Sequence, residues 1–299
     1  MMRVLVTGIR GFTGSYLAEE LLRAGHDVIG VVRHASSKSL SGVQSVHVCD
    51  LTDADSLKAV VASVQPDAVA HLAGISFVSH SDAEAIYRAN LIGSRNLLEA
   101  LLGSGKSLRV VLLASSANVY GNAGVGVLDE TTPLAPANDY AVSKLAMEYV
   151  ARLYLPRLPI VIVRPFNYTG VGQALNFLVP KIVDHFRRRA PVIELGNLDV
   201  ARDFSDVRTI VSIYRRLMEC ESAVGQTFNV CSGQALSLRD VLEMARKISG
   251  HHIEVRVNPA FVRENEVKVL VGSMKRLESY LGPLPRIPFK ETLYWMLTA

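Results

Sequence analysis

The stretch that decides the fold is Thr7-Gly8-Ile9-Arg10-Gly11-Phe12-Thr13-Gly14, which directly follows the apolar run Arg3-Val4-Leu5-Val6. A short buried strand therefore enters a glycine turn, and the amphipathic residues 15–24 continue as a helix. The three glycines in order permit the tight turn, let the backbone approach a pyrophosphate, and allow close packing of helix and strand. The alternative is a glycine turn that binds no ligand, but the strand before it and the helix after it favour a dinucleotide site.

The rest of the chain extends this beginning into a repeated pattern of apolar runs and helical stretches up to about residue 165. Continuous apolar strands separated by helices indicate a parallel sheet covered on both faces. We therefore predict a doubly wound α/β fold, with a dinucleotide-binding domain (1–168 plus 203–232) and a smaller α/β substrate-binding lobe (169–202 plus 233–299). We expect strands at 28–32, 45–48, 68–72, 110–114, 160–163 and 226–230, and helices at 15–24, 54–64, 82–103, 138–154, 206–220 and 237–249.

Composition narrows the class of protein. The 299 residues are 49% hydrophobic and 20% charged with a net charge of +4, as in ordinary globular proteins. The run 187–189 is three arginines, which fits a nucleic-acid or membrane patch less well than a solvated helix face near an anionic ligand. The three cysteines have no metal-ligand spacing, and no apolar run approaches membrane-spanning length. We expect a cytoplasmic protein with free thiols, no metal, and neither nucleic acid nor membrane as a partner.

The end of the second predicted strand indicates which dinucleotide binds. NAD-binding units carry an acidic residue there for the ribose hydroxyls, whereas this chain has Arg33 followed by Ser36, Ser37 and Lys38. A cation with hydroxyl donors suits a 2′-phosphate, so NADP(H) is preferred and NAD(H) is the alternative. Arg33 as a merely solvated strand-end residue stays open. Asp50, after the third strand, is placed either to accept a hydrogen bond from adenine or to cap the next helix.

Tyr140 and Lys144 are spaced by four residues on a predicted helix and therefore lie on one face. An ammonium beside a phenol favours the phenolate, which would lower the tyrosine pKa from about 10. Ser116 follows the predicted strand 110–114 at the carboxyl edge of the sheet, where it could donate to a substrate oxygen beside Tyr140. The alternative is that Ser115 and Ser116 only cap a helix.

Several motifs together resemble the extended short-chain dehydrogenases/reductases that modify nucleotide sugars. They span most of the chain: the glycine motif, His71-Leu72-Ala73-Gly74, Asn90, Ser-Ser-x-x-Val-Tyr-Gly at 115–121, Tyr140-x-x-x-Lys144, Arg164-Pro165-Phe166-Asn167, Arg202-Asp203-Phe204-x-Asp206-Val207 and Asn229-Val230-x-x-Gly233. The resemblance implies that Ser116, Tyr140 and Lys144 are catalytic, that Lys144 also holds the nicotinamide ribose, and that the protein is a homodimer built on helices 82–103 and 138–154.

Residue 118 separates the members of this family. Dehydratases carry a glutamate there as the base that acts at C5, whereas this chain has Asn118, which cannot take a proton from carbon. The tail, with Arg263-Glu264-Asn265-Glu266, resembles the GDP-binding end of GDP-mannose dehydratases and GDP-4-dehydro-6-deoxy-mannose reductases. We therefore expect NADPH-dependent reduction of the C4 ketone of a nucleotide-activated 4-keto-6-deoxy sugar. GDP-4-dehydro-6-deoxy-D-mannose is the favoured substrate, and thymine or uracil in place of guanine stays open. An NAD-dependent nucleotide-sugar 4-epimerase and a GDP-mannose 4,6-dehydratase are the alternatives.

The expected site residues fall into two groups besides the catalytic set. For the cofactor they are Gly8, Arg10, Gly11, Phe12, Gly14, Arg33, Asp50, Leu51, Leu72, Ala73, Gly74, Asn90 and Lys144. For the nucleotide sugar they are Ser76, Ser116, Asn118, Asn167, Phe177, Lys181, Arg202, Arg263 and Glu266.

Overall fold

The computed structural model of the protein describes residues 1–36, 39–76, 82–121, 126–261 and 268–299. Its main element is a parallel sheet of seven strands in the order β11-β7-β5-β4-β1-β2-β3. The chain order therefore reverses between β1 and β4, which is where doubly wound folds bind their ligands. The predicted doubly wound α/β fold is confirmed. The strands are β1 (Arg3–Thr7), β2 (Asp27–Val32), β3 (Ser45–Val48), β4 (Ala68–His71), β5 (Val110–Ala114), β7 (Ile160–Pro165) and β11 (Thr227–Val230).

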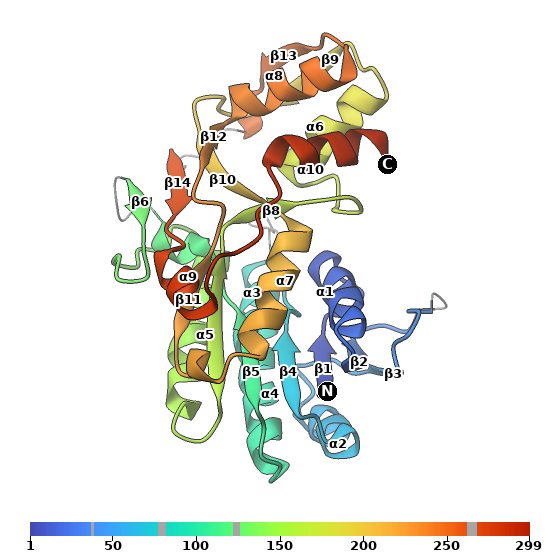
Figure 1. Cartoon of the computed structure of the whole chain (residues 1–299), viewed down its shortest axis with the longest axis vertical. Helices are drawn as coiled ribbons and strands as arrows, with labels where there is room; N and C mark the ends of the chain where they lie inside the picture. Colours follow the sequence, from blue (N-terminus) through green and yellow to red (C-terminus); the bar gives the residue numbers. More distant parts are fainter. Residues whose placement is uncertain (37–38, 77–81, 122–125, 262–267) are drawn as a thin grey trace.

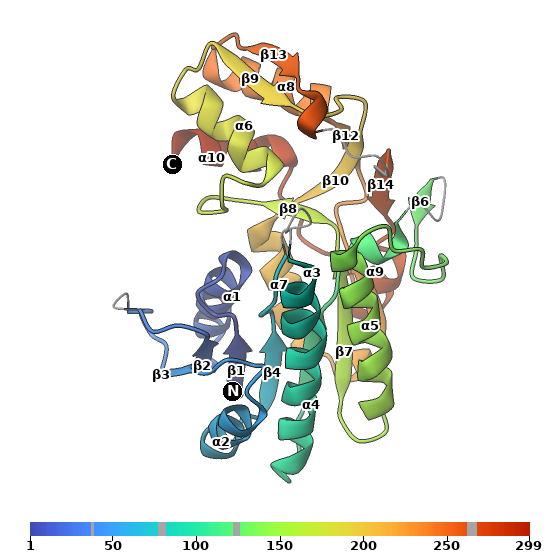
Figure 2. The same cartoon turned by 180° about the vertical axis from the view of Figure 1, so that it is seen from behind.

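Helices cover both faces of this sheet and bury its apolar side chains in two cores. One face carries α1 (Phe12–Arg23) and α7 (Val207–Met218), which pack against each other in front of the sheet in Figure 1. The opposite face carries α2 (Ala54–Val64), α4 (Gly93–Gly103) and α5 (Asp139–Tyr154) (Figure 2). The strands therefore show the unbroken apolar runs of a sheet buried on both sides.

Two predicted helices have different limits in the structure. The first begins at Phe12 rather than at residue 15, since Gly11 already occupies the N-cap position. The predicted helix 82–103 is α3 (Ala83–Tyr87) and α4 joined by one π-helical turn, Arg88–Ile92. Such a turn inserts one extra residue into the helix and often marks a functional site. Here it contains Asn90, whose side chain is fully buried.

A second body of structure lies beyond the carboxyl ends of the large sheet (Figure 1). Its core is formed by three helices, α6 (Leu178–Arg187), α8 (Leu238–Ser249) and α10 (Phe289–Thr298), together with the parallel pair β9 (Val192–Leu195) and β13 (Glu254–Val257). The proline-rich tail gave no indication of α10. The proposed division of the chain into two domains stays a prediction.

A smaller sheet connects the two bodies. Its central strand, β10 (Ala201–Asp206), pairs with β8 (Asn167–Thr169), β12 (Ala235–Ser237) and β14 (Val269–Gly272), and β14 also pairs with β6 (Val127–Leu128). The chain then returns to the large sheet, where α9 (Lys275–Leu281) contacts β11. Short 3₁₀ turns lie at Ala117–Tyr120, Glu221–Ala223 and Pro259–Phe261.

Within the described ranges, no helix has both the length and the apolar character needed to cross a membrane. The same ranges contain no group of three or more His, Cys, Asp or Glu side chains that could hold a metal ion.

Candidate active site

The glycine turn after β1 packs so closely against the residues after β4 that a side chain at Gly8 would not fit. Gly8 has a φ of +70°, and a Cβ atom there would lie 2.9 Å from the backbone N and Cα of Ala73. A Cβ at Gly14 would overlap the carbonyl oxygen of Gly8. Gly11 is the N-cap of α1 and has no side chain that could accept a hydrogen bond. The first backbone amides of α1 are therefore not capped by a side chain. This geometry fits a pyrophosphate, because a helix N-terminus with close backbone access is an anion site.

Two arginines reach the loop that follows β2. Arg10 donates from Nη2 to the carbonyl oxygen of Ser36 at 3.2 Å, and Arg33 donates from Nε to His34 Nε2 at 2.9 Å. Arg10 therefore contacts the segment after β2 that begins with Arg33. Asp50 stands nearby: a hydrogen bond from the amide of Thr52 is the main cause that lowers its pKa, and Arg33 adds to it. The cap of α2 is Asp53, so Asp50 does not cap this helix, and its contact with adenine stays a prediction.

The loop after β4 is held by buried polar side chains. Asn90 Oδ1 accepts a hydrogen bond from the backbone amide of Ile75 at 2.8 Å. Asn90 Nδ2 donates to the carbonyl of Ile75 and to Ser143 Oγ, each at 3.0 Å. The expected cofactor residue Asn90 therefore uses its amide to fix the loop. Leu72, Ala73 and Gly74 form the start of that loop, and a Cβ at Gly74 would lie 3.5 Å from Lys144 Nζ. Leu51 packs against Gly93 at the start of α4.

A neutral histidine links β4 to the glycine turn. His71 Nε2 lies 2.8 Å from Ser94 Oγ, which itself donates to the carbonyl of Asn90, so this ring nitrogen carries the proton. Nδ1 then accepts from Thr7 Oγ1 at 2.7 Å, and Thr7 Oγ1 accepts from the amide of Ala73. Burial lowers the pKa of His71 to about 3, so the ring stays neutral and keeps these hydrogen bonds at any physiological pH.

The structure brings Ser116, Tyr140 and Lys144 together at the carboxyl end of β5. All three side chains are buried, and Tyr140 and Lys144 lie one turn apart in α5. Lys144 Nζ donates to the carbonyl of Ala114 at 2.9 Å. Ser116 also caps the 3₁₀ turn 117–120, and its Oγ accepts from the backbone amide of Asn118 at 3.2 Å and from its side-chain amide at 3.0 Å. Ser116 therefore caps this turn and also lies beside Tyr140.

Burial controls the protonation of this set. It raises the pKa of Tyr140 to about 12, while a hydrogen bond with the Ser116 side chain opposes the rise. The expectation of a Tyr140 pKa below the ordinary value of about 10 is wrong for this structure, because desolvation of the phenolate is the largest contribution. Burial also lowers the pKa of Lys144 to about 8, against the opposing charge of Glu148. Tyr140 is therefore a protonated acid at neutral pH, and Lys144 is an ammonium close to its titration point.

The other predicted sugar residues that the structure describes lie on several elements of the connecting sheet and of the second body, and on the loop after β4. Asn167 lies in β8 beside β10, which carries Arg202, and Arg202 Nη1 donates to the carbonyls of Ala201 and Lys268. Phe177 caps α6, where Lys181 donates to the carbonyl of Glu194 and covers the ring of Phe261. Lys181 is thus engaged with β9 and the turn after β13. Ser76 is exposed on the loop after β4, whereas Arg263 and Glu266 lie outside the described residues.

Sequence reasoning missed a buried ion pair directly behind the catalytic set. Glu148, one turn after Lys144 in α5, accepts from Arg164 of β7 at 2.7 and 2.9 Å and from Ser115 Oγ at 2.5 Å. The spacing of 140, 144 and 148 along one helix face was the available signal. A second missed contact joins Thr13 Oγ1 to the Tyr168 hydroxyl at 2.7 Å, between α1 and β8.

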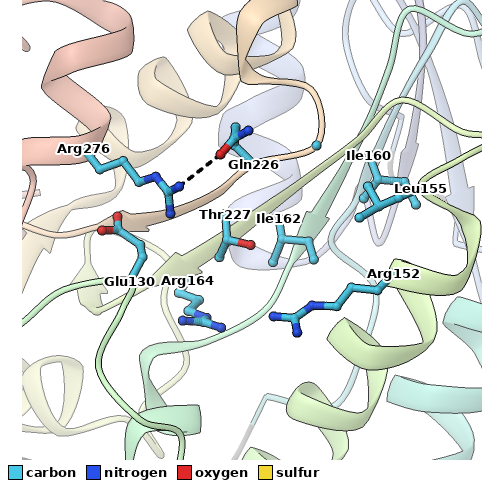
Figure 3. Close-up of a pocket in the computed structure, with 10 residues that line it drawn as sticks. Glu130, Arg152, Leu155, Ile160, Ile162, Arg164, Gln226, Thr227 and Arg276 are labelled. Atoms are coloured by element: carbon cyan, nitrogen blue, oxygen red, sulfur yellow. Dashed lines mark hydrogen bonds between the residues drawn. The ribbon is translucent and has the colours of Figure 1, made fainter.

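A separate cavity of about 270 Å³ opens at the β11 edge of the large sheet (Figure 3). Figure 3 shows Glu130, Arg152, Arg164, Thr227 and Arg276 around it, with Arg276 donating to Gln226 at 3.0 Å. It contains none of the predicted site residues. Arg164, which lines this cavity, is also the partner of Glu148 in α5.

Comparison with known proteins places this arrangement in a family. A family model described as GDP-mannose 4,6 dehydratase matches residues 5–296. The chain belongs to this family. It is 34% identical to the GDP-6-deoxy-D-talose 4-dehydrogenase of Aggregatibacter actinomycetemcomitans, over 94% of this chain and 92% of that protein. It is also 34% identical to the GDP-6-deoxy-D-mannose reductase of Pseudomonas aeruginosa, over 99% and 96% of the two chains. The predicted resemblance is confirmed.

Solved structures agree with this placement. RMD from Pseudomonas aeruginosa, solved with NADPH, is 32% identical over 100% of this chain and 98% of that one, with a TM-score of 0.84. A Burkholderia cenocepacia J2315 protein described as a candidate epimerase is 52% identical over 99% and 96%, with a TM-score of 0.93. The protein is accordingly an NAD(P)-dependent oxidoreductase, as the sequence predicted.

The pKa of Lys144 leads to a test. With the expected contact between Lys144 and the cofactor, NADPH should bind best below pH 8, where the ammonium is charged. As the pH rises through about 8 the charge is lost, so the affinity should fall by up to about tenfold per pH unit. Fluorescence titration of NADPH between pH 6.5 and 9.5 measures this. Lys144→Arg, which stays charged throughout, should show no such fall. A parent affinity that is constant from pH 7 to 9.5 would exclude Lys144 from the cofactor site.

Proposed function

We propose that the protein reduces the C4 ketone of a GDP-activated 4-keto-6-deoxy sugar with NADPH, most simply GDP-4-dehydro-6-deoxy-D-mannose, to a GDP-6-deoxyhexose such as GDP-D-rhamnose. The substrate class is supported by the two curated relatives, which are a GDP-6-deoxy-D-mannose reductase and a GDP-6-deoxy-D-talose 4-dehydrogenase. The proposal places Ser116, Tyr140 and Lys144 in the catalytic roles that the family resemblance implies.

The observation that carries the proposal is the contact between Asn118 and Ser116. The side-chain amide of Asn118 donates to Ser116 Oγ at 3.0 Å, so the position that must supply a carboxylate base for dehydration is occupied by a hydrogen-bond donor. The nearest buried carboxylate on the helix of the catalytic set, Glu148, is already held by Arg164 and Ser115. This geometry supports proton donation to an oxygen, and among the described residues neither Asn118 nor the paired Glu148 offers a free base for C5.

The mechanism follows from the protonation states. When bound, NADPH would supply the hydride that the C4 carbon of the sugar receives. Tyr140, with its raised pKa, enters the reaction protonated and delivers its proton to the oxygen that becomes the C4 hydroxyl. Ser116, with Asn118 donating to its oxygen, turns its own hydrogen toward the same sugar oxygen. Lys144 holds positive charge beside the loop of Gly74 and stabilises the negative charge that develops on Tyr140.

Substrate turnover tests the proposal. The purified protein should consume GDP-4-dehydro-6-deoxy-D-mannose and NADPH together, and it should form no 4-keto product from GDP-mannose. Tyr140→Phe should keep NADPH affinity but lower turnover by about 10²- to 10⁴-fold, the usual effect of general acid catalysis. Tyr294→Phe, at an exposed tyrosine of α10, is the matched control. Dehydration of GDP-mannose at a rate comparable with the reduction would refute the assignment.

Cofactor preference gives a second test. The exposed Arg33 and the neighbouring Arg10 form the corner proposed for the 2′-phosphate. Arg33→Asp replaces attraction by repulsion, so the ratio of kcat/KM for NADPH to that for NADH should fall by at least about tenfold, which is about 1.4 kcal/mol of discrimination. Thermal unfolding should not change, because Arg33 is at the surface. A parent enzyme that already prefers NADH would contradict this interpretation of the corner.

A 4-epimerase is the second candidate, because the 52% identical structure carries an epimerase description. An epimerase must retain its dinucleotide through oxidation and reduction of one sugar, whereas a reductase exchanges it every cycle. Identification of the dinucleotide released on denaturation of the purified protein separates the two: tightly retained NAD would favour the epimerase. The cytoplasmic location stays a prediction.

We also propose that the protein is a homodimer that pairs α4 and α5 with the same helices of a second copy. Leu97, Leu98 and Leu101 of α4 are buried against the sheet. In contrast, Val142, Tyr149 and Leu153 form an exposed apolar stripe along α5, with Leu153 72% exposed. This stripe has the i, i+7, i+11 spacing of one helix face.

Light scattering at micromolar concentration should therefore give twice the mass of the chain. Leu153→Glu should shift the protein toward monomer, because a charge in an apolar helix interface is costly. Val257→Glu, at another exposed valine, should leave the mass unchanged. A monomeric parent would leave the α5 stripe without this explanation.

A further inference from the structure

The pair formed by Glu148 and Arg164 is the most deeply buried charge pair behind the proposed catalytic set. Its side chains are 0% and 2% exposed, and two hydrogen bonds join the guanidinium to the carboxylate. A buried pair loses the hydration of both charges, so apolar residues of similar volume often stabilise a fold equally well. The contacts that the pair makes with its neighbours indicate what it does.

The first contact is with the turn that carries Ser116. Ser115 Oγ donates to Glu148 Oε1 at 2.5 Å, and the Ser115 amide donates to the carbonyl of Val163 in β7 at 2.8 Å. Ser115 is thus fixed through both its side chain and its backbone. Because Ser116 follows it directly and caps the next turn, the orientation of Ser116 depends on the anchoring of Ser115.

The second contact is electrostatic and acts on Lys144. Glu148 lies one helical turn beyond Lys144 on the same face of α5, and both side chains are buried. Burial lowers the pKa of Lys144 to about 8, and the charge of Glu148 opposes this shift. Two further titratable groups surround Lys144: Tyr140 on α5 and His71 on β4. Both are neutral at pH 8, with pKa values of about 12 and about 3, so they supply no compensating negative charge.

Arg164 keeps Glu148 in place from the opposite side. Its Nη1 donates to the Tyr120 hydroxyl at 3.0 Å, and Tyr120 donates to Asn229 Oδ1 at 2.7 Å. The guanidinium also lines the cavity at the sheet edge, where Figure 3 shows it near Arg152 and Thr227. The network therefore crosses the sheet layer from the edge strand β11 to the helix of the catalytic set.

We infer that the Glu148–Arg164 pair is the positioning element of this active site: Glu148 anchors the Ser115–Ser116 turn and supplies the negative charge one helical turn from Lys144. The inference rests on the proposed roles of Ser116 and Lys144. Neither Glu148 nor Arg164 touches the reacting atoms, so both act through their neighbours.

The two effects of Glu148 are separable by mutation. Glu148→Gln leaves Arg164 buried without its counter-charge, so the double variant Glu148→Gln/Arg164→Met, which removes both charges, accompanies it. In both, the pH at which NADPH affinity falls should move from near 8 to a value lower by half a pH unit or more. Ser115→Ala keeps both charges and removes only the anchor. It should lower kcat for sugar reduction severalfold and leave that pH unchanged.

Glu243→Gln is the matched control, since Glu243 also pairs with an arginine, Arg246, but on the exposed surface of α8. It should change neither measurement. A pH of affinity loss that stays at the parent value in both Glu148 variants, with effects confined to the melting temperature, would overturn the electrostatic part. A parent-like kcat in Ser115→Ala would overturn the anchoring part.

The NADPH titration does not involve the sugar. A parent protein that binds NADPH with the expected pH dependence but reduces no GDP-sugar would therefore refute the proposed substrate and still report on Glu148. Failure of the shift in a protein that does reduce the sugar would refute the positioning role alone.

Discussion

The close approach of Gly8 to Ala73 is the constraint on which the rest of the site depends. The ends of β1 and β4 meet where the strand order reverses, and a single Cβ at Gly8 would lie within 2.9 Å of the Ala73 backbone. Only glycine satisfies both this contact and the positive φ of the turn. The approach sets the N-terminus of α1 against the loop that runs past Lys144. The proposed pyrophosphate site and the lysine proposed as catalytic therefore both adjoin this backbone contact.

Desolvation is the second determinant, and it favours reduction. In an exposed pair an ammonium would lower the pKa of the neighbouring tyrosine, which helps an enzyme that must remove a proton. Here burial keeps the phenol protonated and lowers the pKa of the lysine to about 8, so that the lysine is still largely an ammonium at neutral pH. A ketone reductase needs the protonated phenol at the start of its cycle. Binding of an anionic dinucleotide would in turn stabilise the ammonium of Lys144, so cofactor binding and the charge of the site are coupled.

The sequence predicted the sheet and most of its helices because their signals are local. Buried strands appear as apolar runs, and α2 follows its periodicity from residue 54 to 64 as expected. The π-turn around Asn90 was not predicted, since it arises from the fit of Asn90 between Ile75 and Ser143, which are distant in sequence. The sense of the Tyr140 pKa shift was also wrong, because the degree of burial is a tertiary property. Glu148 was within reach of prediction from its i, i+4 spacing, but its partner Arg164 lies on another strand.

The distinction between reductase and dehydratase comes down to one side chain in a shared frame. The family is named after a dehydratase, and this chain keeps the glycine turn, the serine and the tyrosine–lysine pair that such a reaction also needs. Dehydration adds a proton abstraction from carbon, which requires a carboxylate at the position of Asn118. An amide at that position does more than remove the base. By donating to Ser116 Oγ it leaves the serine hydrogen to point away from Asn118, toward an incoming oxygen. Asparagine in place of the glutamate thus removes the base that dehydration needs, and it also orients the serine hydrogen that a simple carbonyl reduction uses.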